Sequence, residues 1–257
     1  MKILVVEDTP INQTMAKLLL EGEGHEAMIA ARGSEALAHL KIGRFDLALM
    51  DLDLPDMSGV EVAKMVRASE TGRAVRTPII ALSGSKSPEL ERQCLQAGMD
   101  GFWVKPIRAE FLTSFVSSAM RERMEKSPEA EKGLERTDEP PTFDLEEALV
   151  ITGGDRRLLA ELASMFLNEM PVFIGKLSLA LSGNERENIS RLAHRLAGSS
   201  ANFGQTLTGL LARRLENAAN AGEDFETLNK LFDSLTRETM RLMKEISAFL
   251  EREYSGG

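Results

Sequence analysis

Length, composition and charge restrict what this chain can be. It has 257 residues, of which 43% are hydrophobic, and a formal net charge of −9. That length fits one large domain or two small ones, and the negative charge argues against nucleic-acid binding, which favours basic surfaces. The single cysteine, Cys94, excludes an internal disulfide and fits a reducing compartment.

The sequence carries no pattern typical of export or membrane insertion. The opening apolar stretch, residues 1–6, is too short for a signal-peptide core and is followed directly by Glu7 and Asp8. We find no apolar run near the roughly 18 residues that a membrane helix needs. We therefore expect a cytoplasmic protein.

Residues 1–121 alternate between short apolar runs and helical patterns. This alternation is typical of strand–helix–strand units around a parallel sheet. We predict an α/β doubly wound domain with a five-stranded parallel sheet and five helices. The expected strands are 3–6, 27–31, 47–50, 78–82 and 101–104.

Residues 122–142 are rich in charge and proline and contain almost no large apolar side chains. Such a composition cannot bury a core, so we interpret this stretch as a flexible linker.

Residues 143–257 show helical periodicity throughout, which predicts an all-α bundle. Gly153 and Gly154 should end one helix, and Asp155 should cap the next. Pro171 lies inside a long periodic segment and is expected to kink or break it.

Chemically useful side chains follow four of the predicted strands. In a doubly wound sheet, ligands bind beyond the carboxyl ends of the strands. We therefore expect one crevice that contains three carboxylates, one hydroxyl and one ammonium. These groups belong to Glu7 and Asp8, Asp51, Ser83 and Lys105.

Three neighbouring carboxylates require positive charge. Two unit charges 4 Å apart interact by about 4 kcal/mol at an effective dielectric near 20. Lys105 supplies one cation, and a set of oxygen ligands favours Mg²⁺ as the other. A phosphate donor could then approach Asp51, with Ser83 and Lys105 sharing the charge of the transferred group.

The motifs "ILVVED", "MDLDLPDMSG", "IIALSG" and "FWVKP" resemble those of the receiver domain of two-component response regulators. The resemblance covers residues 1–121 and implies that Asp51 is the phospho-acceptor. It also implies a metal site made by Glu7, Asp8, Asp51 and the backbone carbonyl of Asp53. Ser83 and Phe102 would form the switch pair, and Lys105-Pro106 would be a cis peptide bond.

A hydrolase with an aspartyl-phosphate intermediate is the alternative from another class. Haloacid-dehalogenase-type phosphatases also use Asp-x-Asp, but a further acidic pair follows their lysine. Here the acidic pair, Glu7 and Asp8, precedes Asp51, and nothing like it follows Lys105 within residues 106–121. The receiver interpretation is therefore favoured.

His194 is the one histidine with a suggestive setting. It lies opposite the apolar face of its predicted helix, with Gly198 one turn further on and Arg191 and Arg195 beside it. A glycine within a helix costs roughly 1 kcal/mol relative to alanine. Its presence suggests that another protein surface approaches the imidazole, and the two arginines could bind phosphoryl oxygens.

The run "HRLAGSSANFG" resembles the signature of histidine phosphotransfer (HPt) domains. The resemblance implies a four-helix bundle with His194 as phospho-acceptor. Ala197 stands where many members of that family have lysine, which leaves Arg191 and Arg195 as the expected phosphate partners.

Together these features predict a phosphorelay protein, not an enzyme with its own ATP site. We expect sensor histidine kinases and other receiver domains as partners, and neither nucleic acid nor membrane. Within this frame, the receiver could instead act only as a regulator of the HPt domain.

Overall fold

The computed structural model describes residues 1–70, 76–84, 87–110 and 140–255. The chain divides into two compact units, Met1–Glu129 and Ala130–Gly257, and we describe each by itself. The linker expected over 122–142 lies mostly outside the described residues, as does the fifth helix expected in the first domain. The domain limits at 121 and 143 therefore stay predictions.

The first unit contains a five-stranded parallel sheet with the strand order β2-β1-β3-β4-β5. This confirms the predicted doubly wound sheet. Because every pair of neighbouring strands is parallel, all carboxyl ends lie at the same edge of the sheet. The strands are β1 (Lys2–Val6), β2 (Glu26–Ala30), β3 (Leu47–Asp51), β4 (Ile79–Ser83) and β5 (Gly101–Val104).

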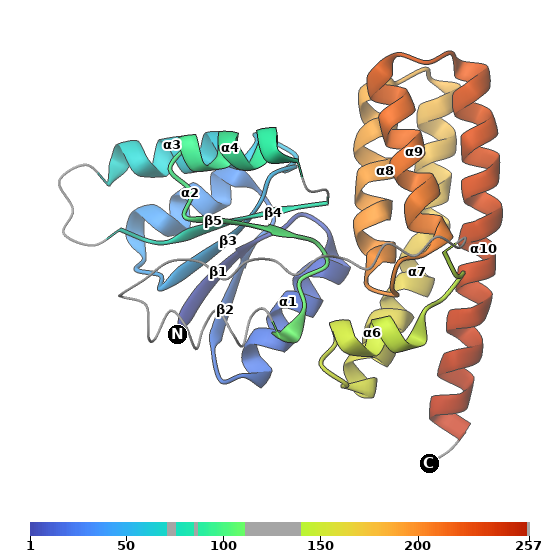
Figure 1. Cartoon of the computed structure of the whole chain (residues 1–257), viewed down its shortest axis with the longest axis horizontal. Coiled ribbons are helices and arrows are strands. Elements are labelled where there is room, and N and C mark those ends of the chain that lie inside the picture. Colours follow the sequence, from blue (N-terminus) through green and yellow to red (C-terminus); the bar gives the residue numbers. More distant parts are fainter. Residues whose placement is uncertain (71–75, 85–86, 111–139, 256–257) are drawn as a thin grey trace. The chain divides into compact units, whose positions relative to one another are not determined.

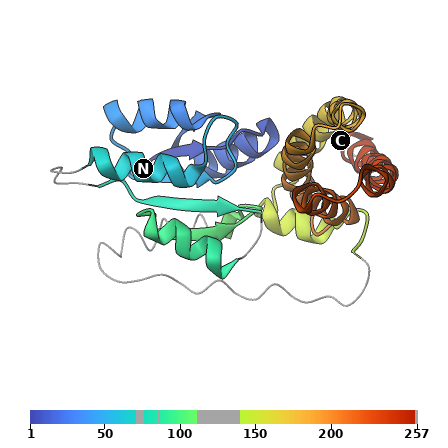
Figure 2. The same cartoon turned by 90° about the horizontal axis from the view of Figure 1, so that it is seen from above.

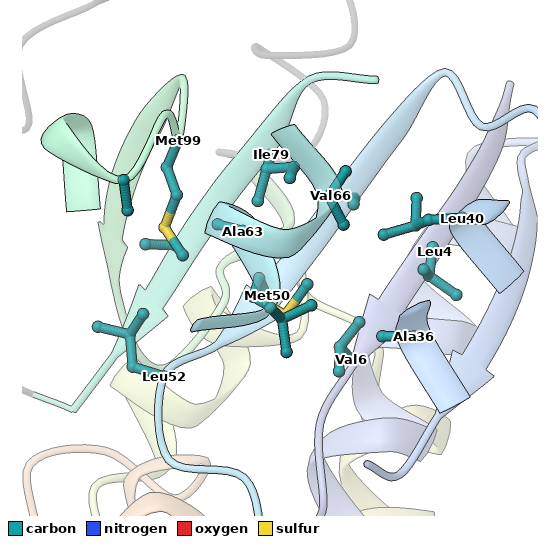
Figure 3. Close-up of a cluster of buried hydrophobic side chains, with 14 of the residues drawn as sticks. Leu4, Val6, Ala36, Leu40, Met50, Leu52, Ala63, Val66, Ile79 and Met99 are labelled. Carbon is teal, nitrogen blue, oxygen red and sulfur yellow. The ribbon is translucent and has the colours of Figure 1, made fainter. Parts of the chain in front are cut away.

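Helices connect these strands (Figure 1). They are α1 (Pro10–Gly22), α2 (Gly33–Ile42), α3 (Gly59–Ser69) and α4 (Pro88–Gln96). Strands β3 and β4 are buried along their whole length, which explains why they are continuous apolar runs. One hydrophobic cluster joins α2, α3 and α4 to the sheet through side chains such as Leu4, Met50, Val66 and Ile79 (Figure 3).

The second unit is helical, as predicted. It contains α6 (Leu145–Ile151), α7 (Arg156–Ser182), α8 (Arg186–Ala201), α9 (Leu207–Ala221) and α10 (Phe225–Ser255). Helices α7 to α10 form a closed ring in which each packs against the next and α10 packs against α7. Figure 2 shows these four helices nearly end-on.

The start of α7 follows the sequence prediction. Gly153 and Gly154 adopt positive φ angles of 65° and 83° just after α6 ends. The Asp155 side chain then accepts hydrogen bonds from the backbone N–H groups of Arg157 and Leu158 at 2.8 and 3.0 Å. This cap satisfies donors that would otherwise be unpaired in the first turn.

Helix α7 continues through Pro171, so the expected break is wrong, whereas the alternative, a kink, stays a prediction. Proline removes one helical hydrogen bond, which costs about 3 kcal/mol or more within a helix. Met170 and Phe173 on either side of it are buried in the bundle. Burying each such side chain contributes roughly 1.5–3 kcal/mol, so packing of both halves offsets the lost bond.

Among the described residues, α7 also has the length and apolar composition that a membrane span needs, although the sequence analysis found no such run. Its buried side chains form one face, whereas Arg157, Glu161 and Lys176 are exposed on the other. Such amphipathicity is typical of a bundle helix.

Helix α6 is held against the turn between α8 and α9. Phe143 packs edge-to-face on Phe203 and Phe249, with ring centroids 6.2 and 5.9 Å apart. Gly204, the last glycine of the HPt-like motif, has a φ of 92°. A Cβ at this position would lie 2.7 Å from the Asp144 Cβ. The glycine is therefore needed both for its backbone angle and for the approach of α6.

We predict that Gly204→Ala destabilises the helical unit by about 1–3 kcal/mol, because alanine is strained at positive φ and clashes with Asp144. Urea unfolding followed by circular dichroism measures this loss. Gly175→Ala is the matched control, since Gly175 lies within α7 and nothing stands within 4 Å of an added Cβ. That control should be neutral or stabilising by up to about 1 kcal/mol. Equal losses in both variants would contradict the argument.

Candidate phosphoryl-acceptor sites

The first candidate site lies at the carboxyl edge of the sheet. Glu7 directly follows β1, Asp51 ends β3, Ser83 ends β4 and Lys105 directly follows β5. Asp51 pairs with Leu82 on β4, and Ser83 pairs with Val104 on β5, so the strand ends are level. The expected convergence of these side chains at one edge is confirmed, whereas their chemical roles remain predictions.

Lys105 joins the two buried carboxylates of this edge. Its Nζ donates to Glu7 Oε2 at 2.6 Å and to Asp51 Oδ2 at 2.7 Å. All three side chains are at least nine-tenths shielded from solvent. A buried ion pair without further partners would be costly, so the double contact is what permits these charges in the interior.

The charges shift one another's pKa values. Burial raises the pKa of the Asp51 carboxyl, Lys105 lowers it and Glu7 raises it again, which brings it to about 7. Burial lowers the pKa of the Lys105 ammonium, but Asp51 and Glu7 outweigh this and raise it overall. The lysine is therefore charged at neutral pH, and Asp51 lies near the point of ionisation without a second cation.

Residues at the start of α1 hold Glu7 in place. Its Oε1 accepts from the Thr9 backbone N–H and from Asn12 Nδ2, both at 3.2 Å. Its backbone carbonyl accepts from Gln13 Nε2 at 2.6 Å. The sequence analysis missed Asn12 and Gln13, which a search for amide side chains one turn after the acidic pair could have found.

The structure brings three acids of the predicted metal site together. Glu7, Asp8 and Asp51 each offer a carboxylate oxygen, and these oxygens lie within 4.8 Å of one another. When all three carboxylates are ionised, the single Lys105 ammonium leaves two negative charges, and an all-oxygen donor set of this charge fits Mg²⁺.

The loop after Asp51 folds back and packs against the end of β3. Asp53 and Ser58 form an isolated bridge, and the Asp53 N–H donates to Asp51 Oδ1 at 3.2 Å. Gly59 starts α3, and a Cβ there would lie 2.2 Å from the backbone oxygen of Asp51. The glycine of the motif is therefore required by this close approach.

The same loop also caps a neighbouring helix. Asp56 accepts from the backbone N–H groups of Gly33 and Ser34, at 2.9 and 3.0 Å, at the start of α2. Burial is the largest single influence and raises the pKa of Asp56, but the hydrogen bonds from Ser34 and Gly33 together outweigh it and lower this pKa to about 2. The carboxylate thus stabilises the positive end of a helix dipole.

The remaining predicted residues of the first unit lie on β4 and β5. Ser83 is buried at the end of β4, and Phe102 pairs with Ala81 and packs against the hydrophobic cluster. The peptide bond Lys105-Pro106 is cis, which confirms that expectation.

The second candidate site lies between α8 and α9. His194 is on α8, and its Nδ1 lies 2.9 Å from Glu216 Oε1 on α9. The two helices also approach closely near the turn that joins them, because a Cβ on Gly209 of α9 would lie 3.0 Å from Ser200 Oγ of α8. Glu216 was missed by the sequence analysis, because no local pattern links positions 22 residues apart.

The predicted neighbours of His194, which are Arg191, Arg195 and Gly198, all lie on α8, and the two arginines have different contacts. Arg191 donates to Asn188 at 2.9 Å on the same helix. The Arg195 guanidinium lies over the Phe173 ring of α7, 5.3 Å from its centroid. Gly198 is one turn further along α8. The phosphate-binding role given to the two arginines remains a prediction.

Comparison with known families assigns both units. Residues 3–117 match the response regulator receiver domain family, and residues 161–249 match the Hpt domain family. The chain joins a receiver domain to an Hpt domain. Both are modules of phosphorelay signalling, and this identity agrees with the family resemblances seen in the sequence.

Curated relatives with both parts are sensor kinases. The chain is 30% identical to the sensor histidine kinase AruS of Pseudomonas aeruginosa over its full length, which is 25% of that protein. It is 26% identical to the signal transduction histidine-protein kinase BarA of Escherichia coli over 97% of this chain and 27% of that protein. The chain thus spans about a quarter of the length of these relatives.

Solved receiver domains resemble the first unit. The receiver domain of the Pseudomonas aeruginosa sensor histidine kinase PA1611, solved with a magnesium ion in its active-site cleft, is 35% identical; the match covers 47% of this chain and 98% of that one, with a TM-score of 0.43. The Vibrio cholerae chemotaxis protein CheY4 is 34% identical, covering 46% and 97%, with a TM-score of 0.42.

We predict that Asp56→Ala destabilises the receiver domain by about 1 kcal/mol at pH 7, because two helix donors lose their acceptor. The folded-state pKa of Asp56 is depressed, so its contribution is present above its unfolded value near 4 and fades as pH falls through about 2. Urea unfolding followed by Trp103 fluorescence reports on this domain, which contains the one tryptophan. Asp56→Asn, which keeps one acceptor oxygen, should lose less. A deficit that is unchanged between pH 7 and pH 2 would contradict the role of the charge.

Proposed function

We propose that this chain relays phosphoryl groups, with Asp51 of the receiver domain and His194 of the Hpt domain as the two acceptors. The observation that carries the proposal is the position of Asp51 within a matched receiver family. Its carboxylate is 2.7 Å from the Lys105 ammonium and shares the edge of the sheet with Glu7 and Asp8.

The residues around Asp51 suit an acceptor. A carboxylate oxygen of Asp51 forms the bond to phosphorus, while the bond from phosphorus to the donor nitrogen breaks and its electron pair stays on that nitrogen. Lys105 keeps a positive charge beside the incoming oxygens. Ser83, at the end of β4, would donate a hydrogen bond from its hydroxyl to the phosphoryl group. Phe102 would change its position together with Ser83, as its partner in the switch pair.

Glu7, Asp8, Asp51 and the backbone carbonyl of Asp53 would hold Mg²⁺. When bound, this ion supplies positive charge that offsets the carboxylates and the phosphoryl oxygens. The acidic cluster supports this assignment, because Lys105 alone cannot balance its three carboxylates when all are ionised.

The domain composition supports partners of two kinds. Sensor histidine kinases would supply phosphoryl groups to Asp51, and other receiver domains would exchange them with His194. The curated relatives are themselves sensor kinases in which the matching region is about a quarter of the protein. We place this exchange in the cytoplasm.

We predict that Asp8→Asn weakens Mg²⁺ binding by at least about tenfold and nearly abolishes labelling of Asp51 by acetyl phosphate. The reason is that Asp8 contributes one of the three clustered carboxylates. Titration of Trp103 fluorescence with Mg²⁺ and the rate of labelling measure the two effects. Glu21→Gln, which removes a carboxylate from the exposed end of α1, is the matched control. Labelling of Asp8→Asn at the wild-type rate would contradict the metal role.

We also predict two chemically distinct labels. Phospho-aspartate is an acyl phosphate and should be lost in mild alkali, whereas phosphohistidine should survive alkali and be lost in acid. Label that enters through a separate receiver should appear in both classes on the wild-type chain. Asp51→Asn should remove the alkali-labile class, and His194→Gln should remove the acid-labile class. Acid-labile label on His194→Gln would show that another histidine is the acceptor.

A further inference from the structure

Helix α2 is capped by a side chain that does not belong to it. The residue at its N-cap position, Arg32, makes no side-chain cap, because a guanidinium has only donors. Asp56, in the loop between β3 and α3, accepts from the Gly33 and Ser34 N–H groups instead, at 2.9 and 3.0 Å. The first turn of a helix leaves such N–H groups without partners inside the helix. The loop that follows Asp51 is thus attached to a different helix.

Apolar packing reinforces this attachment. A Cβ on Gly33 would lie 2.5 Å from Met57 Cγ and 2.8 Å from Val62 Cγ2. The missing side chain at position 33 therefore allows Met57, the neighbour of Asp56, to pack directly against the first turn of α2. Met57 is partly buried against the hydrophobic cluster of the domain. One carboxylate and one apolar side chain hold the same part of the loop.

The base of the loop lies at the proposed metal site. Asp53 and Ser58 form a bridge across it, and the Gly59 N–H donates to the Leu52 carbonyl at 3.0 Å. Residues 53–58 are therefore a short closed loop, with its base beside the acceptor strand and its far end on α2. In so short a loop, the position of the far end restricts the backbone at the base.

We propose that Asp56 is a positioning residue for the Mg²⁺ site, which anchors the loop to α2 and so holds the Asp53 carbonyl in place before the ion binds. This inference rests on the proposed function, in which that carbonyl is a ligand of Mg²⁺. A loop detached from α2 gives the carbonyl several orientations, and ion binding must then select one of them. A carbonyl that is already in place avoids this entropic cost.

Asp56 acts through the loop and not as a ligand. One of its oxygens accepts from Gly33 and the other from Ser34, so both are directed at α2. Among the described residues, it does not belong to the acidic cluster whose oxygens lie within 4.8 Å of one another. The effect of Asp56 on the ion is therefore an effect of backbone position.

The coupling between ion and anchor must act in both directions. If the anchored loop binds Mg²⁺ more tightly than the detached loop, Mg²⁺ stabilises the anchored loop by the same factor. Detachment exposes the N–H groups of Gly33 and Ser34 to water, so their hydrogen exchange reports on it. Bound Mg²⁺ should therefore slow exchange at the start of α2, a helix that supplies none of the proposed ligands.

The test uses the full-length chain and magnesium chloride at pH 7 and physiological ionic strength. Isothermal titration calorimetry gives the Mg²⁺ dissociation constant, and circular dichroism checks that each variant is folded. Asp56→Ala removes both acceptor oxygens, whereas Asp56→Asn keeps one. Glu35→Ala is the matched control, because Glu35 is an exposed carboxylate at the same helix start that accepts from the Ala31 N–H at 2.8 Å, outside the loop. NMR measures exchange of Gly33 and Ser34 with and without saturating Mg²⁺.

Asp56→Ala should raise the Mg²⁺ dissociation constant by about three- to tenfold, at or below the lower end of what loss of an outer contact costs at a metal site. Asp56→Asn should raise it less, and Glu35→Ala should leave it near the wild-type value. In the wild-type chain, saturating Mg²⁺ should slow exchange of Gly33 and Ser34 by the same factor by which Asp56→Ala weakens binding.

The outcomes separate this inference from the proposed function. A wild-type chain that neither binds Mg²⁺ nor is labelled on Asp51 by acetyl phosphate would overturn the proposed function itself. Mg²⁺ binding that is equally tight in wild type and folded Asp56→Ala would overturn only the role of Asp56, as would an equal loss in Glu35→Ala, which would indicate an effect of general charge. Exchange at Gly33 and Ser34 that does not respond to Mg²⁺ would also overturn it. This last measurement uses the wild-type chain and decides the question even if Asp56→Ala does not fold.

Discussion

The ammonium of Lys105 between two buried carboxylates is the contact around which the receiver domain is arranged. Glu7 and Asp51 end neighbouring parallel strands, so their charges are forced together wherever the sheet forms. The Lys105 ammonium, which follows β5, contacts both carboxylates and allows both to be buried. The apolar strands, the tight loop at Gly59 and the amide contacts to Glu7 all fix the geometry of that contact.

The candidate site of the Hpt domain is built from two facing helices and not from strand ends. In the bundle, the His194 ring on α8 lies 2.9 Å from the Glu216 carboxylate, which the facing helix α9 supplies. Small residues such as Ser200 and Gly209 allow α8 and α9 to approach closely near the turn that joins them. One domain therefore places charge through strand ends, and the other through the distance between two helices.

Much of this arrangement could be predicted from local pattern. Strand periodicity places Glu7, Asp51, Ser83 and Lys105 at one edge, since parallel strands leave no other choice. Glu216 and Asp56 could not be found in that way, because each acts on a residue distant in sequence and the register between the elements comes from packing. The continuation of α7 through Pro171 could not be found locally for the same reason: packing of the buried side chains on both sides outweighs the tendency of proline to end a helix.

Helices α7 and α10 are far longer than α8 and α9, so His194 occupies the four-helix part of the domain while the remainder is closed by α6 and the Phe143 cluster. The two regions carry different demands. Under the proposed function, the four-helix part presents the His194 ring to other proteins, and this requirement restricts its surface. The proposed function places no such requirement on the aromatic end, so substitutions that change stability should be better tolerated there.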